Sequence, residues 1–233
     1  MIDLQNKTPK ILVVGDLMID HYLWGSSERI SPEAPVPVVN VDSESTVLGG
    51  AGNVINNLNA LGAMVDVISV IGECETSKEL KELLCDIKVE TQYLITQKNR
   101  VTSKKSRIIA AQQQVVRYDR ESTSEINNKS QVAILKVFKK IVNNYDVILL
   151  SDYGKGVLTF ELTQSLITIA NENKKKLLVD PKGLNYSKYN GAYLLTPNKK
   201  EASEATNSVI KDNKSLTQAI KSLKKQCNLE VSL

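Results

Sequence analysis

The residue types best suited to chemistry form a glycine-rich turn followed by an amide side chain. Residues 48–62 hold glycines at positions 49, 50 and 52, and Asn53 follows at the point where a helix can begin. A backbone without Cβ atoms lets a ligand approach closely, and the first N–H groups of a helix are free to bind an anion. Gly50, Ala51, Gly52 and Asn53 therefore form a candidate site for a small polyhydroxy or anionic ligand.

A second candidate site is the basic segment from Arg100 to Arg120. It contains six basic residues and one acidic residue, a local charge of +5, whereas the whole chain carries +4. Its side chains alternate with period two in two runs, and a bend at 110–113 would join them, which predicts a β-hairpin with one charged face. Lys105, Arg107 and Arg117 could converge on one anion, and a solvated sheet face explains the same pattern equally well.

Polar residues also follow several predicted strands, at the end where ligands bind in open α/β sheets. The position of Asp20, just past a strand over 11–14, favours a ligand role, whereas for Asp16 a turn or capping role explains the residue as well. Three later strand ends carry the pairs Asp152 with Lys155, Asp180 with Lys182, and Asn198 with Glu201. Because parallel strands end at one edge, these pairs predict a site there.

The elements that must position these residues alternate between strands and helices. Apolar runs predict strands over 11–14, 65–72, 89–96, 147–150, 176–179 and 192–195. Helical spacing predicts helices over 53–61, 77–84, 130–142, 159–170, 200–205 and 216–224, and residues 229–233 resemble the start of a strand. This alternation indicates an α/β fold with a parallel sheet. The proline-rich segment 31–47 predicts an edge strand or a separate flap.

The composition excludes several classes of function. A net charge of +4 is too balanced to indicate nucleic-acid binding, and no apolar run is long enough to span a membrane. Three distant cysteines without a CxxC pair and a single histidine argue against disulfides and zinc and favour a reducing, cytoplasmic setting. The sequence also lacks the dinucleotide-binding fingerprint, the P-loop and the G-x-S-x-G motif of serine hydrolases, which argues against these three kinds of site.

Taken together, the glycine turn, Asp20 and the segment 196–201 resemble the ribokinase-like (PfkB) sugar kinases, and Asn198 and Glu201 match that family's N-x-x-E motif. The resemblance implies a three-layer α/β/α fold, with a mainly parallel central sheet and a small β lid built from residues of about 20–48 and 98–121. The resemblance is closer to one group, the D-glycero-β-D-manno-heptose 7-phosphate kinases, in segments 29–39, 105–121, 151–156 and 180–183.

This resemblance implies transfer of the ATP γ-phosphoryl group to the anomeric hydroxyl of heptose 7-phosphate, giving the 1,7-bisphosphate for ADP-heptose and lipopolysaccharide core synthesis. ATP and Mg2+ would be the cofactors, a homodimer would form through the lid, and a nucleotidyltransferase domain could be fused to the kinase. The implied sugar-binding residues are Asp20, Gly50, Ala51, Gly52, Asn53, Gln113, Gln114 and Asp152. The implied phosphate-binding residues are Lys105, Arg107 and Arg117 for the 7-phosphate, Lys155 for the transferring group, and Asn198 and Glu201 for magnesium and phosphate.

In the family, the catalytic base is an aspartate in a later G-A-G-D motif, which this sequence does not contain. We therefore expect residues 1–233 to be the N-terminal part of one kinase domain and to be inactive alone. Two other interpretations fit the same residues: a ribokinase-like kinase for another sugar phosphate, and a non-catalytic sugar-phosphate-binding module.

Overall fold

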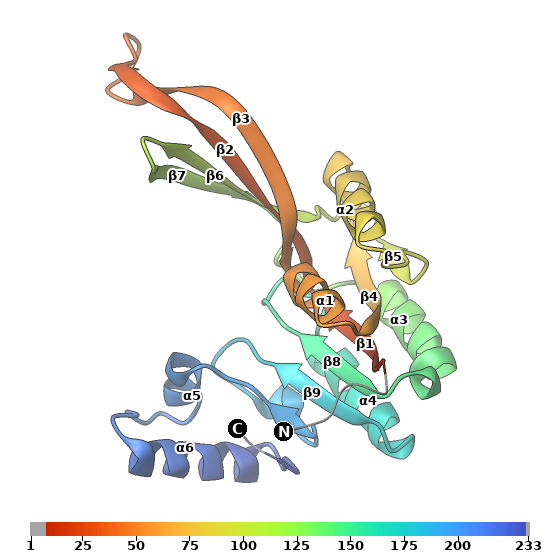
Figure 1. Ribbon diagram of the computed structural model, residues 1–233. Helices are drawn as coiled ribbons and strands as arrows, with labels where there is room; N and C mark the ends of the chain where they lie inside the picture. The colour runs from red at the N-terminus through yellow and green to blue at the C-terminus, as the bar shows by residue number, and fades with distance from the viewer. Residues whose placement is uncertain (1–7, 232–233) are drawn as a thin grey trace.

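The computed structural model describes residues 8–231, and its centre is a six-stranded sheet (Figure 1). Every strand pair in this sheet is parallel, which confirms the α/β fold. Its strands, in spatial order, are β10 (Leu194–Leu195), β9 (Lys176–Asp180), β8 (Val147–Ser151), β1 (Lys10–Gly15), β4 (Met64–Ile71) and β5 (Leu94–Thr96).

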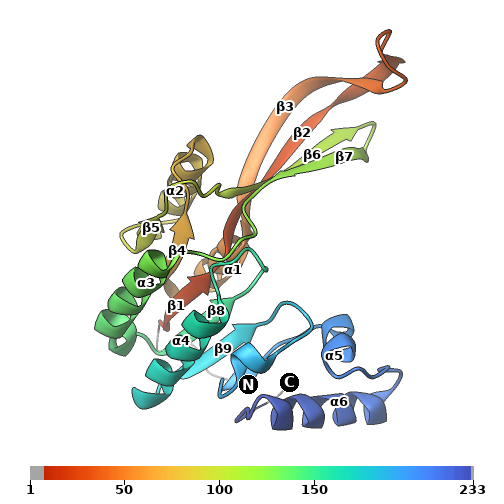
Figure 2. The same cartoon turned by 180° about the vertical axis from the view of Figure 1, so that it is seen from behind.

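Helices cover both faces of this sheet because its strands are apolar on both sides. In β1, Val13 packs in one core cluster with α1 (Ala51–Ala60) and α2 (Glu75–Asp86), whereas Leu12 and Val14 pack in another with α3 (Asn128–Ile141) and α4 (Phe160–Glu172). The result is the three-layer arrangement expected from the sequence. Helices α5 (Lys199–Ala205) and α6 (Asn213–Gln226) lie on the β9–β10 side of the molecule (Figures 1 and 2).

A second, four-stranded sheet, which we call the arm, extends away from this body (Figures 1 and 2). Its order is β3 (Pro37–Gly50), β2 (Leu17–Ile30), β6 (Ser103–Ala110) and β7 (Gln113–Arg120). Strands β6 and β7 are the predicted hairpin, and its turn residues Ala111 and Gln112 both have positive φ. The proline-rich segment ends in β3, an edge strand that begins with Pro37, where a missing N–H is tolerated.

Several boundaries differ from the sequence prediction. The strand expected over 89–96 is only β5, because Val89 N donates to Leu84 O at the end of α2 and Leu94 N closes a turn on Thr91 O. The strand expected over 192–195 is likewise reduced to β10. Residues 229–231 form no strand, although Val231 N donates to Tyr193 O (2.9 Å), and 232–233 lie outside the described residues.

The first helix also starts earlier than predicted. It begins at Ala51, two residues before Asn53, because Gly50 adopts a left-handed backbone (φ +55°) that ends β3 and turns the chain at once. Leu61, expected on the apolar face of this helix, is 83% exposed. Short 3-10 turns over Val142–Asn144 (η1) and Ser187–Tyr189 (η2) complete the described structure. Over residues 8–231, no helix combines the length and apolarity needed to cross a membrane.

Candidate functional site

The order in which the chain adds strands to the central sheet reverses between β1 and β8. From β1 the chain builds β4 and β5 towards one edge, and from β8 it builds β9 and β10 towards the other. Ligands of such doubly wound sheets bind outside the carboxyl ends of the strands at this reversal. Asp16 follows β1 directly, and the segment 152–157 follows β8. The position expected for a ligand, which we call the crevice, therefore lies between residues that the sequence singles out.

Asp16 fixes the backbone of the loop after β8. Its Oδ2 accepts hydrogen bonds from Tyr153 N (2.9 Å) and Lys155 N (3.1 Å), and its Oδ1 accepts one from Val157 N (3.1 Å). The side chain is buried. Burial raises the pKa of Asp16 and the charge of Asp152 adds to the effect, whereas the three backbone donors oppose it. This carboxylate is therefore a structural support, one of the two roles that its sequence position left open.

Asp152 is held almost as firmly. Its Oδ1 accepts Gly154 N (2.8 Å), and its Oδ2 accepts the Tyr189 hydroxyl (2.8 Å) and forms an ion pair with Lys188 Nζ (2.5 Å). Only 3% of the residue is exposed. Burial, together with the neighbouring Asp152 carboxylate, raises the pKa of Tyr189, so this tyrosine remains a neutral hydrogen-bond donor at neutral pH.

These contacts continue along the strand ends towards β10. Tyr189 also accepts a hydrogen bond from Lys182 N (3.0 Å), and Lys182 Nζ lies 3.2 Å from Glu201 Oε1. At the start of α5, Asn198 and Glu201 form a capping box: Asn198 N donates to Glu201 Oε2 (3.0 Å), and Glu201 N donates to Asn198 Oδ1 (2.9 Å). The structure thus gives these two motif residues a local capping role.

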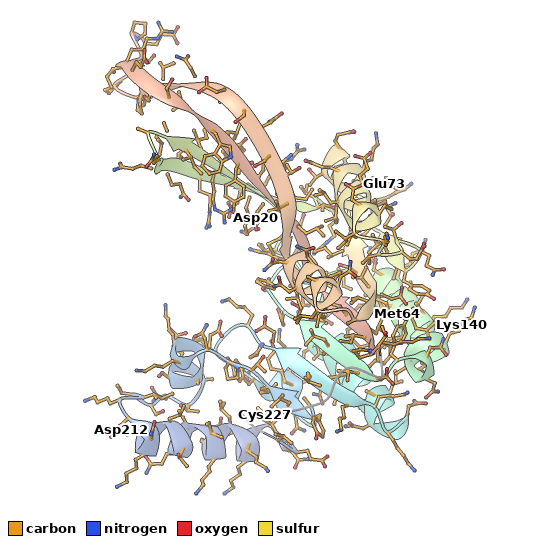
Figure 3. The ribbon with its side chains drawn as sticks, in the orientation of Figure 1. Asp20, Met64, Glu73, Lys140, Asp212 and Cys227 are labelled. Atoms are coloured by element: carbon orange, nitrogen blue, oxygen red, sulfur yellow. The ribbon has the colours of Figure 1, made fainter. Side chains whose placement is uncertain are left out.

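The glycine turn places the base of the arm against the crevice. A Cβ atom at Gly49 would lie only 2.4 Å from Asp20 Oδ2, so the Asp20 carboxylate can rest on this turn only if residue 49 is glycine. Ala51 N donates to Asp16 O (3.0 Å). Asn53 lies exposed in the first turn of α1. The turn and Asp20 therefore meet beside the reversal point, and Figure 3 labels Asp20 near the base of the arm.

Strand register brings the basic residues of the arm to one face. Asp20 lies opposite Lys105, and Tyr22 lies opposite Arg107. Across the hairpin, Lys105 faces Asp119 and Arg107 faces Arg117. Directly paired residues point to the same side of a sheet, so Lys105, Arg107 and Arg117 lie on one face of the arm. Arg107 Nη1 lies 2.5 Å from Asp20 Oδ1, and its guanidinium sits 5.3 Å from the centre of the Tyr22 ring.

Carboxylates of the chain already pair these cations. Lys105 Nζ lies 2.8 Å from Asp119 Oδ2 and 3.3 Å from Glu121 Oε2, and Lys155 Nζ lies 2.6 Å from Glu121 Oε1. Burial opposes ionisation of Glu121, but Lys155 and Lys105 outweigh it and lower the pKa of this carboxyl group. Glu121 thus joins the charged face of the arm to the loop at the strand ends.

Two of the selected residues, Gln113 and Gln114, lie near the tip of the hairpin. Gln113 pairs with Ala110, Gln114 pairs with Ile109, and both glutamines are exposed. A cavity of about 650 Å³ lies elsewhere, at the amino end of β9, where its lining includes Lys176 and Tyr193. Within residues 8–231, no three His, Cys, Asp or Glu side chains are grouped to hold a metal ion directly.

Sequence reasoning missed several residues of this group. Glu121 continues the period-two alternation of Arg117 and Asp119, so the signal that found those residues could have found it as well. Lys188 and Tyr189 lie in an irregular segment where no spacing singles them out. Arg100 is buried and donates to Ser124 O (3.0 Å) and to Lys155 O, a contact that only the folded chain reveals.

Comparison with known proteins places the chain in a family. A model of the pfkB family of carbohydrate kinases matches residues 8–232, so the chain belongs to the pfkB family of carbohydrate kinases. "Bifunctional protein HldE" of Aliarcobacter butzleri (strain RM4018) is 64% identical over 228 residues, which are 98% of this chain and 48% of that protein. The protein of the same name from Sulfurimonas denitrificans is 57% identical over 230 residues, 99% of this chain and 48% of that protein. The chain spans about half the length of these curated relatives.

Solved structures agree on the fold. An Arabidopsis thaliana ribokinase complexed with ribose and ATP superposes with a TM-score of 0.71 at 16% identity, covering 97% of this chain and 72% of that one. The tetrameric inhibited form of phosphofructokinase-2 from Escherichia coli gives a TM-score of 0.72 at 18% identity, covering 96% and 72%. The ribokinase-like fold expected from the sequence is therefore confirmed.

Proposed function

We propose that this chain carries the sugar-phosphate site of an ATP-dependent kinase for D-glycero-β-D-manno-heptose 7-phosphate, which forms the 1,7-bisphosphate on the route to ADP-heptose and the lipopolysaccharide core. The observation that carries the proposal is the row of cations beside Asp20 on the arm. Lys105, Arg107 and Arg117 share one face, next to the crevice at the strand ends. A sugar that already carries a phosphate needs such a cationic surface in addition to its hydroxyl-binding groups.

In this proposal, different residues bind different parts of the acceptor, the sugar phosphate. Asp20 and Asn53 bind sugar hydroxyls beside the glycine turn, and the arm cations bind the phosphate. Asp152, held by Tyr189, supports the sugar end of the crevice. Lys155 offers its charge where the transferring group would lie. Phosphoryl transfer depends mainly on positioning and charge neutralisation, which these residues would supply.

ATP and Mg2+ are part of the same proposal. Glu201 Oε2 already accepts Asn198 N, and Glu201 Oε1 lies 3.2 Å from Lys182 Nζ. Both carboxylate oxygens thus have partners, so Asn198 and Glu201 suit contact with a hydrated magnesium ion through its water shell better than direct ligation. When bound with ATP, the ion would neutralise phosphate charge. Because ATP is supplied there, we place the activity in the cytoplasm.

The catalytic base is proposed to lie outside residues 1–233, in the family's G-A-G-D motif. The domain boundaries proposed from the sequence follow: residues 1–233 form the N-terminal part of the kinase domain, with the lid over about 20–48 and 98–121. The relatives named as bifunctional, of which this chain covers about half, support the further proposal of a fused nucleotidyltransferase domain. These 233 residues alone would then bind the sugar phosphate without turnover.

The arm is also proposed to form a homodimer contact. Val116 and Tyr118 lie opposite Ile108 and Ser106 and are 46% and 51% exposed, so this face of β7 is apolar as well as open. We expect the chain to sediment as a dimer and the V116K/Y118K variant to shift towards monomer, because buried lysines would oppose the contact. Val132→Lys, at an exposed valine of α3, is the matched control. A monomeric wild-type chain, or a variant that remains dimeric, would contradict this contact.

A thermal-shift panel tests the substrate class on this chain. Heptose 7-phosphate is expected to raise the melting temperature more than the same heptose without phosphate, because the arm cations bind only the phosphorylated form. A larger shift with a different sugar phosphate would favour a kinase for that sugar. Equal shifts with and without phosphate would reject the assignment of the arm cations.

A further inference from the structure

Glu121 contacts two lysines to which the proposed function assigns phosphate groups, Lys105 for the sugar's own phosphate and Lys155 for the transferring group. Its two carboxylate oxygens reach separate cations, Oε1 at 2.6 Å from Lys155 Nζ and Oε2 at 3.3 Å from Lys105 Nζ. One of these lysines belongs to the arm and the other to the loop after β8. A carboxylate bridging two ammonium groups in this way uses the charges that a phosphate group would use.

The surroundings of Glu121 show that this bridge is held in place. The side chains of Glu121, Lys105 and Lys155 are only 15–17% exposed. The Lys155 backbone is fixed on both sides, because its N–H donates to Asp16 (3.1 Å) and its carbonyl oxygen accepts from Arg100. Arg100 also binds Ser124 O (3.0 Å) at the chain segment that leaves the arm. Glu121 therefore links two parts of the molecule that other contacts already hold close together.

The other carboxylates near this bridge pair with cations of the arm. Asp119 pairs with Lys105 (2.8 Å) and Arg117 (3.0 Å), and Asp20 pairs with Arg107. Each of these carboxylates stays within the arm sheet, whereas Glu121 alone among them reaches Lys155. Displacing Glu121 would therefore release Lys155 from this carboxylate and leave Lys105 paired with Asp119.

We propose that the Glu121 carboxylate is a built-in occupant of the substrate's anion site, holding Lys105 and Lys155 together until a phosphate group displaces it. The inference rests on the proposed function and adds a ligand-exchange step to it. It makes anion binding a competition within the chain, because the phosphate must outcompete one carboxylate for the two lysines.

Glu121→Gln tests the proposal, because the amide keeps the size of the side chain and removes its charge. The probe is inorganic phosphate, titrated at constant ionic strength against chloride and followed by two-dimensional NMR at the backbone amides of Lys105, Arg107 and Lys155. We expect E121Q to bind phosphate about tenfold more tightly than the wild type, since the competing charge is gone. In chloride it should melt at a lower temperature than the wild type, and phosphate should restore most of the difference.

Glu79→Gln is the matched control. Glu79 pairs with Lys104 (2.8 Å), the neighbour of Lys105 on the opposite face of β6, and the two side chains are 29% and 25% exposed. E79Q should lose stability without any gain in phosphate affinity or any extra recovery in phosphate.

Unchanged or weaker phosphate binding by E121Q, or an equal gain by E79Q, would overturn the proposal. If phosphate shifts Lys105 and Arg107 equally in the wild type and E121Q, only the exchange step fails and the proposed function stands. If phosphate shifts neither residue in either protein, the anion site of the proposed function fails as well.

Discussion

Replacing Arg107 with methionine is expected to weaken binding of the phosphorylated sugar by about 100-fold, or about 2.8 kcal/mol. Two losses add in this variant. The guanidinium can no longer bind the phosphate, and Asp20, whose Oδ1 it contacts at 2.5 Å, loses its partner. The Asp20 carboxylate, 21% exposed, would then repel an incoming phosphate. Removing one member of a shielded charge pair typically has effects of this size.

The measurement is calorimetric titration of the phosphorylated sugar into the wild-type chain and its variants. Arg107→Lys should recover part of the affinity, because it keeps the charge but loses the planar fork. Arg120→Met is the matched control, since Arg120 pairs with Lys104 on the opposite face of the same hairpin. The affinity lost in R107M should also shrink as salt rises. Equal affinity for R107M and R120M would contradict the placement of the phosphate on this face.

Replacing Asp16 with alanine is expected to lower the free energy of unfolding by about 3 kcal/mol, because it leaves three backbone donors without their acceptor. Those donors are Tyr153 N, Lys155 N and Val157 N, and they shape the loop that carries Lys155. The variant should therefore also bind the phosphorylated sugar more weakly. Urea unfolding measures the stability, with the slope compared to confirm that the folded state is unchanged.

The free energy of unfolding of the Asp16→Asn variant should lie between those of the wild type and D16A. One carbonyl oxygen can still accept, but the amide nitrogen would face a donor that the carboxylate now satisfies. Asp146→Ala is the control. Asp146 precedes β8, and its exposed carboxylate accepts a single backbone hydrogen bond, from Lys10 N at the start of β1 (2.8 Å). If D16A were no less stable than D146A, Asp16 would not be the support that its contacts indicate.

Periodicity in the sequence predicted most of the fold because the core is regular. The runs 11–14 and 147–150 are buried on both faces, which is why they appear as uninterrupted apolar strands. The hairpin was predicted equally well, since its alternation survives in β6 and β7. The predicted boundaries were wrong where other contacts set them: Val89 closes the end of α2, and the turn at Gly50 lets α1 begin at Ala51, two residues before Asn53.

The candidate site was predictable in its parts but not in its connections. The sequence pattern alone singled out Asp20 and Asp152, which follow predicted strands, and Arg107, which lies on the charged face of the predicted hairpin. Their partners come from distant segments: Tyr189 reaches Asp152 from 37 residues away, and Arg107 reaches Asp20 across 87 residues. Such pairings depend on strand order and register, which a local pattern does not contain. Asp16 shows the same limit, because its role is set by a loop more than 130 residues later.

The kinase reaction itself is the most direct test of the proposed function. The proposed complete kinase domain, with its G-A-G-D motif, is incubated with ATP, Mg2+ and heptose 7-phosphate, and the product is followed by phosphorus NMR. We predict a bisphosphate with its new phosphate on the anomeric carbon, and no turnover by residues 1–233 alone. Phosphorylation of only the unphosphorylated sugar, or of heptose 7-phosphate at another hydroxyl, would contradict it.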